Sequence, residues 1–210
     1  MGLQRILMII GLATLAVVTG VWLQLRMSAP AVPPETNATL LRTARPIDEV
    51  RLQDTLGNEF HIQQLQGRWS LVFFGFTHCP DVCPTTLTIL AQVARGLSDL
   101  PEAQRPRLVF VTVDPERDVP AVIKGYVEHF DKNMIGLTGE LSQVEALAAQ
   151  LGVAFQKVPL DQGDYSMDHS AAILMLNPDA QLNAIISAPH TVEGISDDYR
   201  KIITFMDKQT

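Results

Sequence analysis

The chain has 210 residues, of which 47% are hydrophobic and 19% are charged, so its composition is that of a folded protein rather than a disordered one. Its formal net charge of −7 argues against a protein that grips nucleic-acid phosphates with a basic face, and no nucleic-acid partner is expected. Two cysteines are too few for a disulfide-rich scaffold or a four-thiolate zinc site, so their spacing is more informative than their number.

An apolar run without charges, residues 6–25, lies near the N-terminus between Arg5 and Arg26. As a helix this run would measure about 30 Å, the thickness of the hydrocarbon core of a bilayer. We therefore expect residues 1–26 to form a single transmembrane anchor. A cleaved signal peptide is one alternative, because Ala29-Pro30-Ala31 has the small-x-small form of a cleavage site, although signal peptides usually have a shorter apolar stretch. A buried core helix is the other, and the missing polar face argues against it.

A proline-rich segment, residues 27–46, follows the apolar run and shows little apolar periodicity. It is expected to be an extended tether, or alternatively a disordered stub. Residues 47–210 are then the folded domain, which is long enough for one hydrophobic core.

Within this domain, the hydrophobic pattern alternates between the periods of strands and helices. A hairpin is expected around Leu56-Gly57-Asn58, strands are expected at 70–76, 107–114, 134–138, 171–176 and 182–186, and helices are expected at 87–97, 122–130, 142–151 and 195–206. Ser142 and Glu145 predict a capping box at the start of the third helix, and Gly152 predicts its end. The alternation predicts a three-layer α/β domain with a central mixed sheet and an N-terminal hairpin.

Both cysteines lie in one short segment, Cys79-Pro-Asp-Val-Cys83-Pro84, between a buried strand and a helix. Open α/β sheets place their sites at this end of a strand. Pro84 suits the first helical position, which would make Cys83 the N-cap and favour its thiolate form. If the segment makes a single turn, both sulfurs can lie on one side and form a disulfide or bind one metal ion. Two purely structural cysteines are the alternative.

Two thiolates make an incomplete site for most metals, so a third ligand is needed. Four of the five histidines, His61, His78, His129 and His190, are interpreted as solvated or structural residues. His169 differs because it ends a polar segment, residues 164–170, just before an apolar run; the residues alone leave it open between a ligand and a capping or solvated histidine. Two cysteines and one histidine would suit Cu(I) or, with a further weak ligand, Cu(II).

Four other residues are candidates for supporting roles. Asp168 could hydrogen-bond the ring nitrogen that a metal leaves free on the neighbouring histidine, and Asp81, between the cysteines, is a further candidate for the surroundings of the metal. Met167 is a soft donor for which packing is the favoured interpretation. In Asp114-Pro-Glu-Arg-Asp118, the last aspartate is expected to cap the following helix rather than to act as a catalytic carboxylate.

Four segments carry a resemblance to a known family: residues 67–84, Thr112-Val-Asp-Pro-Glu-Arg-Asp118, Gly136-Leu-Thr-Gly139 and Asp164-Tyr-Ser-Met-Asp-His-Ser170. Together and in this order they resemble the SCO/SenC family of copper chaperones for cytochrome c oxidase assembly. The resemblance implies a thioredoxin-like fold and one copper ion per chain, bound by Cys79, Cys83 and His169.

The resemblance further implies a metallochaperone, not an enzyme, that delivers copper to the dinuclear copper site of cytochrome c oxidase. Its partners would be the oxidase subunit that carries this site, other copper chaperones or thiol reductants, and the membrane. The globular domain is expected outside the cytoplasm, on the periplasmic side of a bacterial membrane or in the equivalent intermembrane space.

Two other activities compete with copper delivery. A thiol–disulfide oxidoreductase would reduce the cysteines of the oxidase copper site and form a Cys79–Cys83 disulfide. A peroxidase is disfavoured, because Thr77 and Cys79 do not have the usual peroxidase spacing and no resolving cysteine follows.

Overall fold

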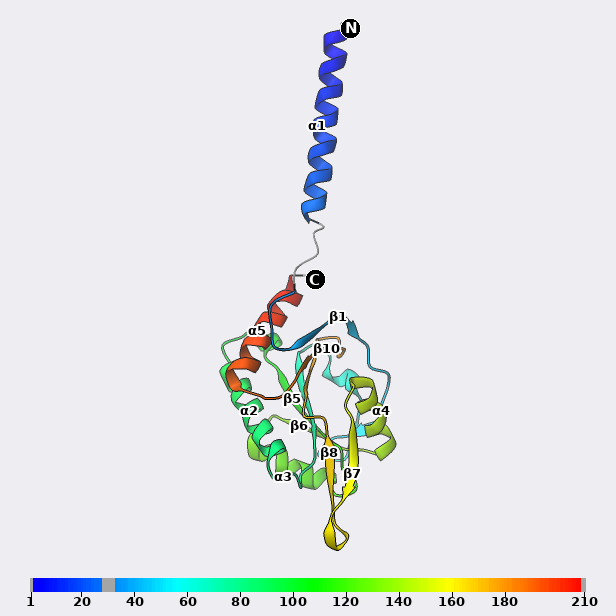
Figure 1. Ribbon diagram of the computed structural model, residues 1–210, viewed down its shortest axis with the longest axis vertical. Helices are drawn as coiled ribbons and strands as arrows, with labels where there is room; N and C mark the ends of the chain where they lie inside the picture. Colours follow the sequence, from blue (N-terminus) through cyan, green and yellow to red (C-terminus); the bar gives the residue numbers. More distant parts are fainter. Residues whose placement is uncertain (1, 28–32, 209–210) are drawn as a thin grey trace. The chain divides into compact units, whose positions relative to one another are not determined.

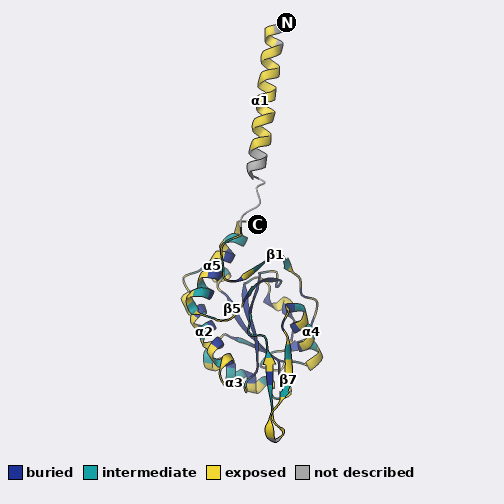
Figure 2. Cartoon of the chain, viewed as in Figure 1, coloured by how far each residue is buried: buried dark blue, intermediate teal, exposed yellow. Residues whose placement is uncertain are grey.

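The computed structural model describes residues 2–27 and 33–208, which belong to two separate compact units (Figure 1). The first unit contains one helix, α1 (Leu3–Met27), whose described side chains are largely exposed (Figure 2). Among the described residues, no helix combines the length and the apolar character needed to cross a membrane. The transmembrane character expected of residues 1–26 therefore has no support from the structure.

A six-stranded mixed sheet forms the centre of the second unit, in the order β1-β10-β9-β4-β5-β6. The strands are β1 (Thr39–Arg45), β4 (Ser70–Gly75), β5 (Arg107–Thr112), β6 (Ile135–Leu137), β9 (Ile173–Leu176) and β10 (Leu182–Ile186). β4, β5 and β6 run parallel, whereas β9, β10 and β1 pair antiparallel with their neighbours. Every residue of β4 is buried, as expected for a strand that is covered on both faces.

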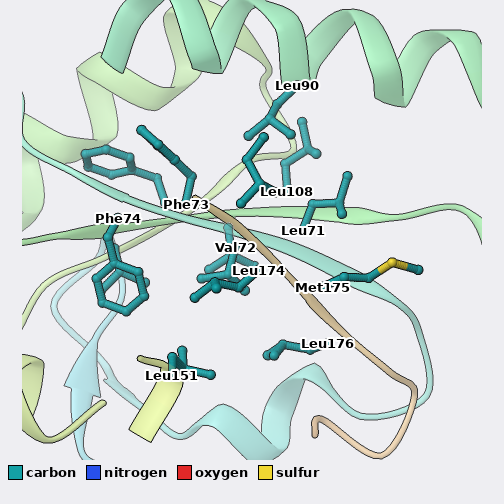
Figure 3. Close-up of a cluster of buried hydrophobic side chains, with 14 of the residues drawn as sticks. Leu71, Val72, Phe73, Phe74, Leu90, Leu108, Leu151, Leu174, Met175 and Leu176 are labelled. Carbon is teal, nitrogen blue, oxygen red and sulfur yellow. The ribbon is translucent and has the colours of Figure 1, made fainter. Parts of the chain in front are cut away.

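Helices cover both faces of this sheet, which confirms the predicted three-layer architecture. α2 (Val82–Gly96), α3 (Pro120–Phe130) and α5 (Val192–Asp207) lie on one face, and α4 (Leu141–Leu151) lies on the other (Figure 1). Alternate residues of β4 serve the two layers: Leu71 lies on the side of Leu90 from α2, and Val72 lies on the side of Leu151 from α4 (Figure 3). Three short 3₁₀ turns complete the unit: η1 (Ile62–Leu65), η2 (Glu102–Gln104) and η3 (Asp161–Gly163).

Two small hairpins stand beside the central sheet. The first, β2 (Leu52–Gln53) with β3 (Glu59–Phe60), confirms the predicted hairpin, and Gly57 in its turn has a φ of +81°. The second, β7 (Phe155–Pro159) with β8 (Tyr165–His169), was not predicted. The segment 164–170, expected to be the end of a polar loop, is thus mostly a strand; it lacks a strand-like apolar pattern because most of the hairpin is solvent-facing.

The folded unit begins earlier than residue 47. It starts at Pro34, and residues 39–45, expected to belong to the tether, form β1 and pair with β10 at the sheet edge. Most β1 side chains are exposed or half-buried, so the strand has the mixed composition of an edge strand and no core-like signature.

Two predicted helix starts are wrong by one or two residues. α2 begins at Val82 with Asp81 as its N-cap residue, so Cys83 lies inside the first turn and is not the cap. α4 begins at Leu141, which places Ser142 inside the helix and removes the expected capping box. The end of α4 is as predicted, because Gly152 adopts the left-handed conformation with a φ of +73°.

Candidate metal site

The site brings together two elements that are far apart in the sequence. Cys83 lies in the first turn of α2, His169 ends β8, and His169 Nε2 lies 3.5 Å from Cys83 Sγ. Cys79 is in the turn between β4 and α2, where its Sγ accepts a hydrogen bond of 3.4 Å from the backbone N–H of Cys83. Both cysteines are free thiols. Cys83 and His169 thus meet at the carboxyl end of β4, and Cys79 lies in the turn beside them.

The neighbours of the His169 ring define its tautomer. Nδ1 lies 3.0 Å from the backbone carbonyl oxygen of Ser170, which can only accept a hydrogen bond, so Nδ1 carries the proton. Nε2, which faces Cys83, is then the unprotonated nitrogen with a free lone pair. The partner that orients the ring is therefore a backbone carbonyl, and not the carboxylate of Asp168 as predicted; Asp168 is exposed on β8.

Burial controls the protonation of the contact pair. Cys83 is fully buried, and this burial raises the pKa of its thiol. Burial also lowers the pKa of His169, so the imidazole is neutral at pH 7 and able to donate its lone pair. The expectation that Cys83 would favour the thiolate is wrong, because Cys83 is not at the cap and its burial raises the pKa of the thiol. Cys79 is the more exposed of the two sulfurs.

Aromatic rings and one glycine shape the surroundings of Cys83 and His169. The rings of Phe73 and Phe76 both meet the His169 ring edge to face, with centroids 6.0 Å apart. A Cβ atom at Gly75 would lie 2.9 Å from Cys83 Sγ, so any larger residue there would clash with the sulfur and displace it. Cys83 is thereby fully buried beside the aromatic rings, whereas His169 stays partly exposed.

The turn that carries Cys79 is held by a buried carboxylate. Asp118 has no exposed surface and accepts hydrogen bonds from the backbone N–H of Thr77 at 2.9 Å, the hydroxyl of Thr77 at 2.5 Å and the hydroxyl of Thr112 at 2.6 Å. The predicted capping role of Asp118 is wrong, because the N-cap residue of α3 is Val119. Asp118 instead ties the cysteine turn to the end of β5.

The hairpin that carries His169 is held by the same short segment. Tyr165 donates its hydroxyl to Asp114 at 2.9 Å, and Arg117 donates both to the Asp114 carboxylate and, at 3.1 Å, to the backbone carbonyl of Tyr165. The Arg117 guanidinium also lies 3.7 Å from the centroid of the Tyr165 ring. Residues 114–118 therefore support both halves of the site, a role that sequence reasoning missed although it singled out the segment at a strand end.

The remaining candidates lie outside the contact pair. Asp81 is exposed and accepts a 3.4 Å hydrogen bond from the Thr85 hydroxyl, and Met167 is buried, in keeping with the packing role that was favoured. His78 is half exposed and contacts the Thr77 hydroxyl at 3.2 Å. The other histidines have separate positions: His61 pairs with Glu59, His129 is exposed on α3, and His190 contacts the Ala171 carbonyl at 2.7 Å.

The three donors do not yet form a closed metal cage. Within the part of the chain that the structure describes, no three His, Cys, Asp or Glu side chains are arranged so that they could hold a metal ion. Cys83 and His169 already touch, whereas the Cys79 sulfur contacts the backbone N–H of Cys83.

The fold and this donor set define a thioredoxin-like protein in which a dithiol turn faces a histidine. The chain belongs to the SCO1/SenC family, whose model matches residues 42–204. A Stutzerimonas stutzeri protein, named as a proposed copper-binding protein, is 38% identical over 173 residues, covering 81% of this chain and 83% of its own. The human mitochondrial SCO2 homolog is 37% identical over 202 residues, covering 95% of this chain and 76% of its own. The copper-bound crystal structure of Arabidopsis thaliana ScoI superimposes with a TM-score of 0.70 at 30% identity, covering 75% of this chain and 98% of that one.

Proposed function

We propose that this chain is a metallochaperone that binds one copper ion through Cys79, Cys83 and His169 and delivers it to the dinuclear copper site of cytochrome c oxidase. The observation that carries the proposal is the 3.5 Å contact between Cys83 Sγ and the unprotonated Nε2 of His169. A relative named as copper-binding and a copper-bound neighbour structure support the choice of metal.

The donor set matches the chemistry of copper. Thiolates and imidazole are ligands that Cu(I) and Cu(II) accept, whereas hard cations such as Mg²⁺ prefer oxygen. Copper would displace the proton of the Cys83 thiol, and the His169 ring, held by the Ser170 carbonyl, needs no change of tautomer to coordinate. Because one cysteine is partly exposed, a partner protein can reach the ion for transfer.

The proposal includes attachment to a membrane and a location outside the cytoplasm. It rests on the sequence, in which residues 6–25 carry no charge, and on the family layout. Fractionation of cells tests this part: the full-length chain should stay with membranes after an alkaline wash, and a variant lacking residues 1–26 should be released. Release of the full-length chain would contradict the anchor.

Copper titration of the reduced protein tests the proposed site. The wild type should bind one Cu(I) per chain, and His169→Ala should weaken binding by more than about 10–100-fold, the loss typical of a residue that only supports a ligand. Cu(II) should be affected more than Cu(I), because two thiolates can still hold Cu(I) linearly. His129→Ala, an exposed histidine on α3, is the matched control and should bind like the wild type. Equal affinities in all three proteins would show that the site is wrong.

A second function, reduction of the target's cysteines, is favoured by the state of the two thiols. Both are free, the Cys83 N–H contacts Cys79 Sγ at 3.4 Å, and Cys79 is the accessible sulfur. Cys79 would attack a target disulfide, and Cys83 would then close the Cys79–Cys83 disulfide, so that two electrons and two protons pass to the target. Oxidase assembly in cells with only His169→Ala separates the functions: failure supports copper delivery, and normal assembly alongside failure of Cys79→Ser supports reduction.

A further inference from the structure

A second polar site lies at the other end of the parallel strands. Arg68 precedes β4 and Arg107 opens β5, whereas the cysteine turn follows the carboxyl end of β4. Together with Arg95 and Arg105, these residues line a pocket of about 500 Å³, here called the arginine pocket. The whole chain has only 16 Lys and Arg and a net charge of −7, so four cations in one pocket are a marked concentration.

Backbone carbonyls hold three of the four guanidinium groups. Arg68 donates from Nη2 to the carbonyl of Arg105 at 3.1 Å, and Arg105 donates from Nε to the carbonyl of Leu100 at 2.8 Å. Arg107 donates to the carbonyls of Gln64 at 3.0 Å and Gln66 at 3.2 Å. These bonds fix the side chains in place without neutralising them, because a carbonyl carries no net charge.

Among the described residues, no carboxylate forms an ion pair with these arginines, although Asp99 interacts electrostatically with Arg105. In the described chain the arginine–carboxylate ion pairs within 4.0 Å involve Arg117 and Arg200, and none involves the arginine pocket. Glu102 and Asp131 also line the pocket, but neither pairs with an arginine there, which leaves the lining with two more positive than negative groups.

Two of the arginines, Arg68 and Arg107, are in electrostatically unfavourable surroundings. Burial and then the charge of Arg68 lower the pKa of Arg107, so the two guanidinium groups repel each other across the pocket wall. The Nε of Arg68 is buried and has no hydrogen-bond partner. An anion between these guanidinium groups would relieve their mutual repulsion.

We propose that the arginine pocket binds a phosphate-class oxyanion, either free phosphate or the phosphate of an anionic lipid headgroup. Guanidinium groups bind such anions through paired, charge-assisted hydrogen bonds, and fixed guanidinium groups lose little side-chain entropy on binding. The site is separate from Cys79, Cys83 and His169, so it does not depend on the proposed copper function.

Titration of the full-length chain with inorganic phosphate tests the site, with amide NMR shifts around Arg68 and Arg107 as the readout. Arg95→Gln/Arg107→Gln should weaken binding at least tenfold. Arg95→Gln alone should weaken binding severalfold. It guards against a folding defect in the double variant, because the Arg95 side chain makes no hydrogen bond or ion pair within the described chain. Arg42→Gln/Arg45→Gln removes the same charge from exposed positions of β1 and should leave binding unchanged.

Vesicles distinguish the two sources of phosphate. If the anion is a headgroup, the wild type should bind phosphatidylglycerol vesicles more tightly than phosphatidylcholine vesicles, and Arg95→Gln/Arg107→Gln should lose this preference while the β1 control keeps it. Binding of inorganic phosphate without a vesicle preference would assign free phosphate as the ligand. The proposal is wrong if the wild type neither binds inorganic phosphate nor prefers anionic vesicles. It is also wrong if the β1 control loses as much binding as the pocket variant.

Discussion

The proton between Cys83 and His169 can reside on the sulfur or on the imidazole, and burial determines which of the two states is favoured. A thiolate beside an imidazolium would place two charges in an apolar pocket, whereas a thiol beside a neutral imidazole places none. Burial raises the pKa of Cys83 and lowers that of His169, so both shifts favour the neutral pair. Copper binding must therefore release the Cys83 proton, and copper affinity should fall as the pH is lowered.

The raised pKa of Cys83 predicts how the stability of the metal-free protein depends on pH. Above the ordinary cysteine pKa of about 8.5, the unfolded chain loses the thiol proton while the folded chain keeps it. The free energy of unfolding should therefore fall as the pH rises above that value, by up to about 1.4 kcal/mol per pH unit from this group. Urea unfolding between pH 7 and 9.5 measures the slope. Cys83→Ser should flatten it, and an unchanged slope in that variant would contradict the assignment to Cys83.

At the level of elements, the loop between β5 and α3 organises the site. Its two aspartates bind different elements of the site. Asp118 accepts hydrogen bonds from Thr77 in the turn of Cys79, and Asp114 accepts one from Tyr165 in the hairpin of His169. Neither carboxylate touches a predicted ligand. Their effect on copper binding would come from fixing the two elements that present the ligands.

Asp118→Ala should cost stability and also weaken copper binding. It removes the acceptor of one buried and two partly buried hydrogen bonds. Leaving such donors unpaired costs about 1–3 kcal/mol, so we expect a loss of about 3 kcal/mol. Denaturant unfolding measures the loss, and Cu(I) competition measures the affinity of the folded fraction. Asp197→Ala, an exposed carboxylate paired with Lys201, is the control and should cost less than about 1 kcal/mol. If the two variants lost equal amounts of stability and copper affinity, Asp118 would have no special role in supporting the site.

The strongest elements of the fold could be predicted because their sequence signals are local. β4 and β9 are continuous apolar runs, and α5 shows a helical apolar stripe, so burial is encoded in the residues themselves. β1 and the β7–β8 hairpin were missed, since an edge strand or an exposed hairpin is stabilised by backbone pairing that any polar sequence can make.

The sequence and the resemblance predict three candidate ligands, and the structure brings two of them, Cys83 and His169, into contact. Cysteine and histidine side chains are common ligands of soft metal ions, so Cys79, Cys83 and His169 could be grouped from the sequence and the resemblance. The group that orients His169 is the carbonyl of Ser170, and every residue has a carbonyl. Residue types therefore pointed to the carboxylate of Asp168, which the structure leaves exposed.

At the scale of the molecule, residues 34–46 are part of the folded unit. β1 supplies the outer strand of the sheet by pairing with β10. Just before it, the backbone N–H groups of Asn37 and Ala38 donate at 3.1 and 2.9 Å to the carboxylate of Asp198, which is 1% exposed. The carboxylate lies on α5, so this contact ties the start of the unit to its last helix.

Deletion of residues 1–46 should therefore destabilise the domain, whereas deletion of residues 1–33 should not. The longer deletion removes β1 and both amide partners of Asp198, and a buried charge left without partners costs about 3–5 kcal/mol, a large part of the 5–15 kcal/mol that stabilises a typical domain. Urea unfolding of the two shortened proteins measures the difference. Introducing Asp198→Asn into both should narrow the gap, because an unpaired amide costs less than an unpaired carboxylate. Equal unfolding midpoints would instead mean that the independent domain does begin at residue 47 and that β1 contributes nothing to its stability.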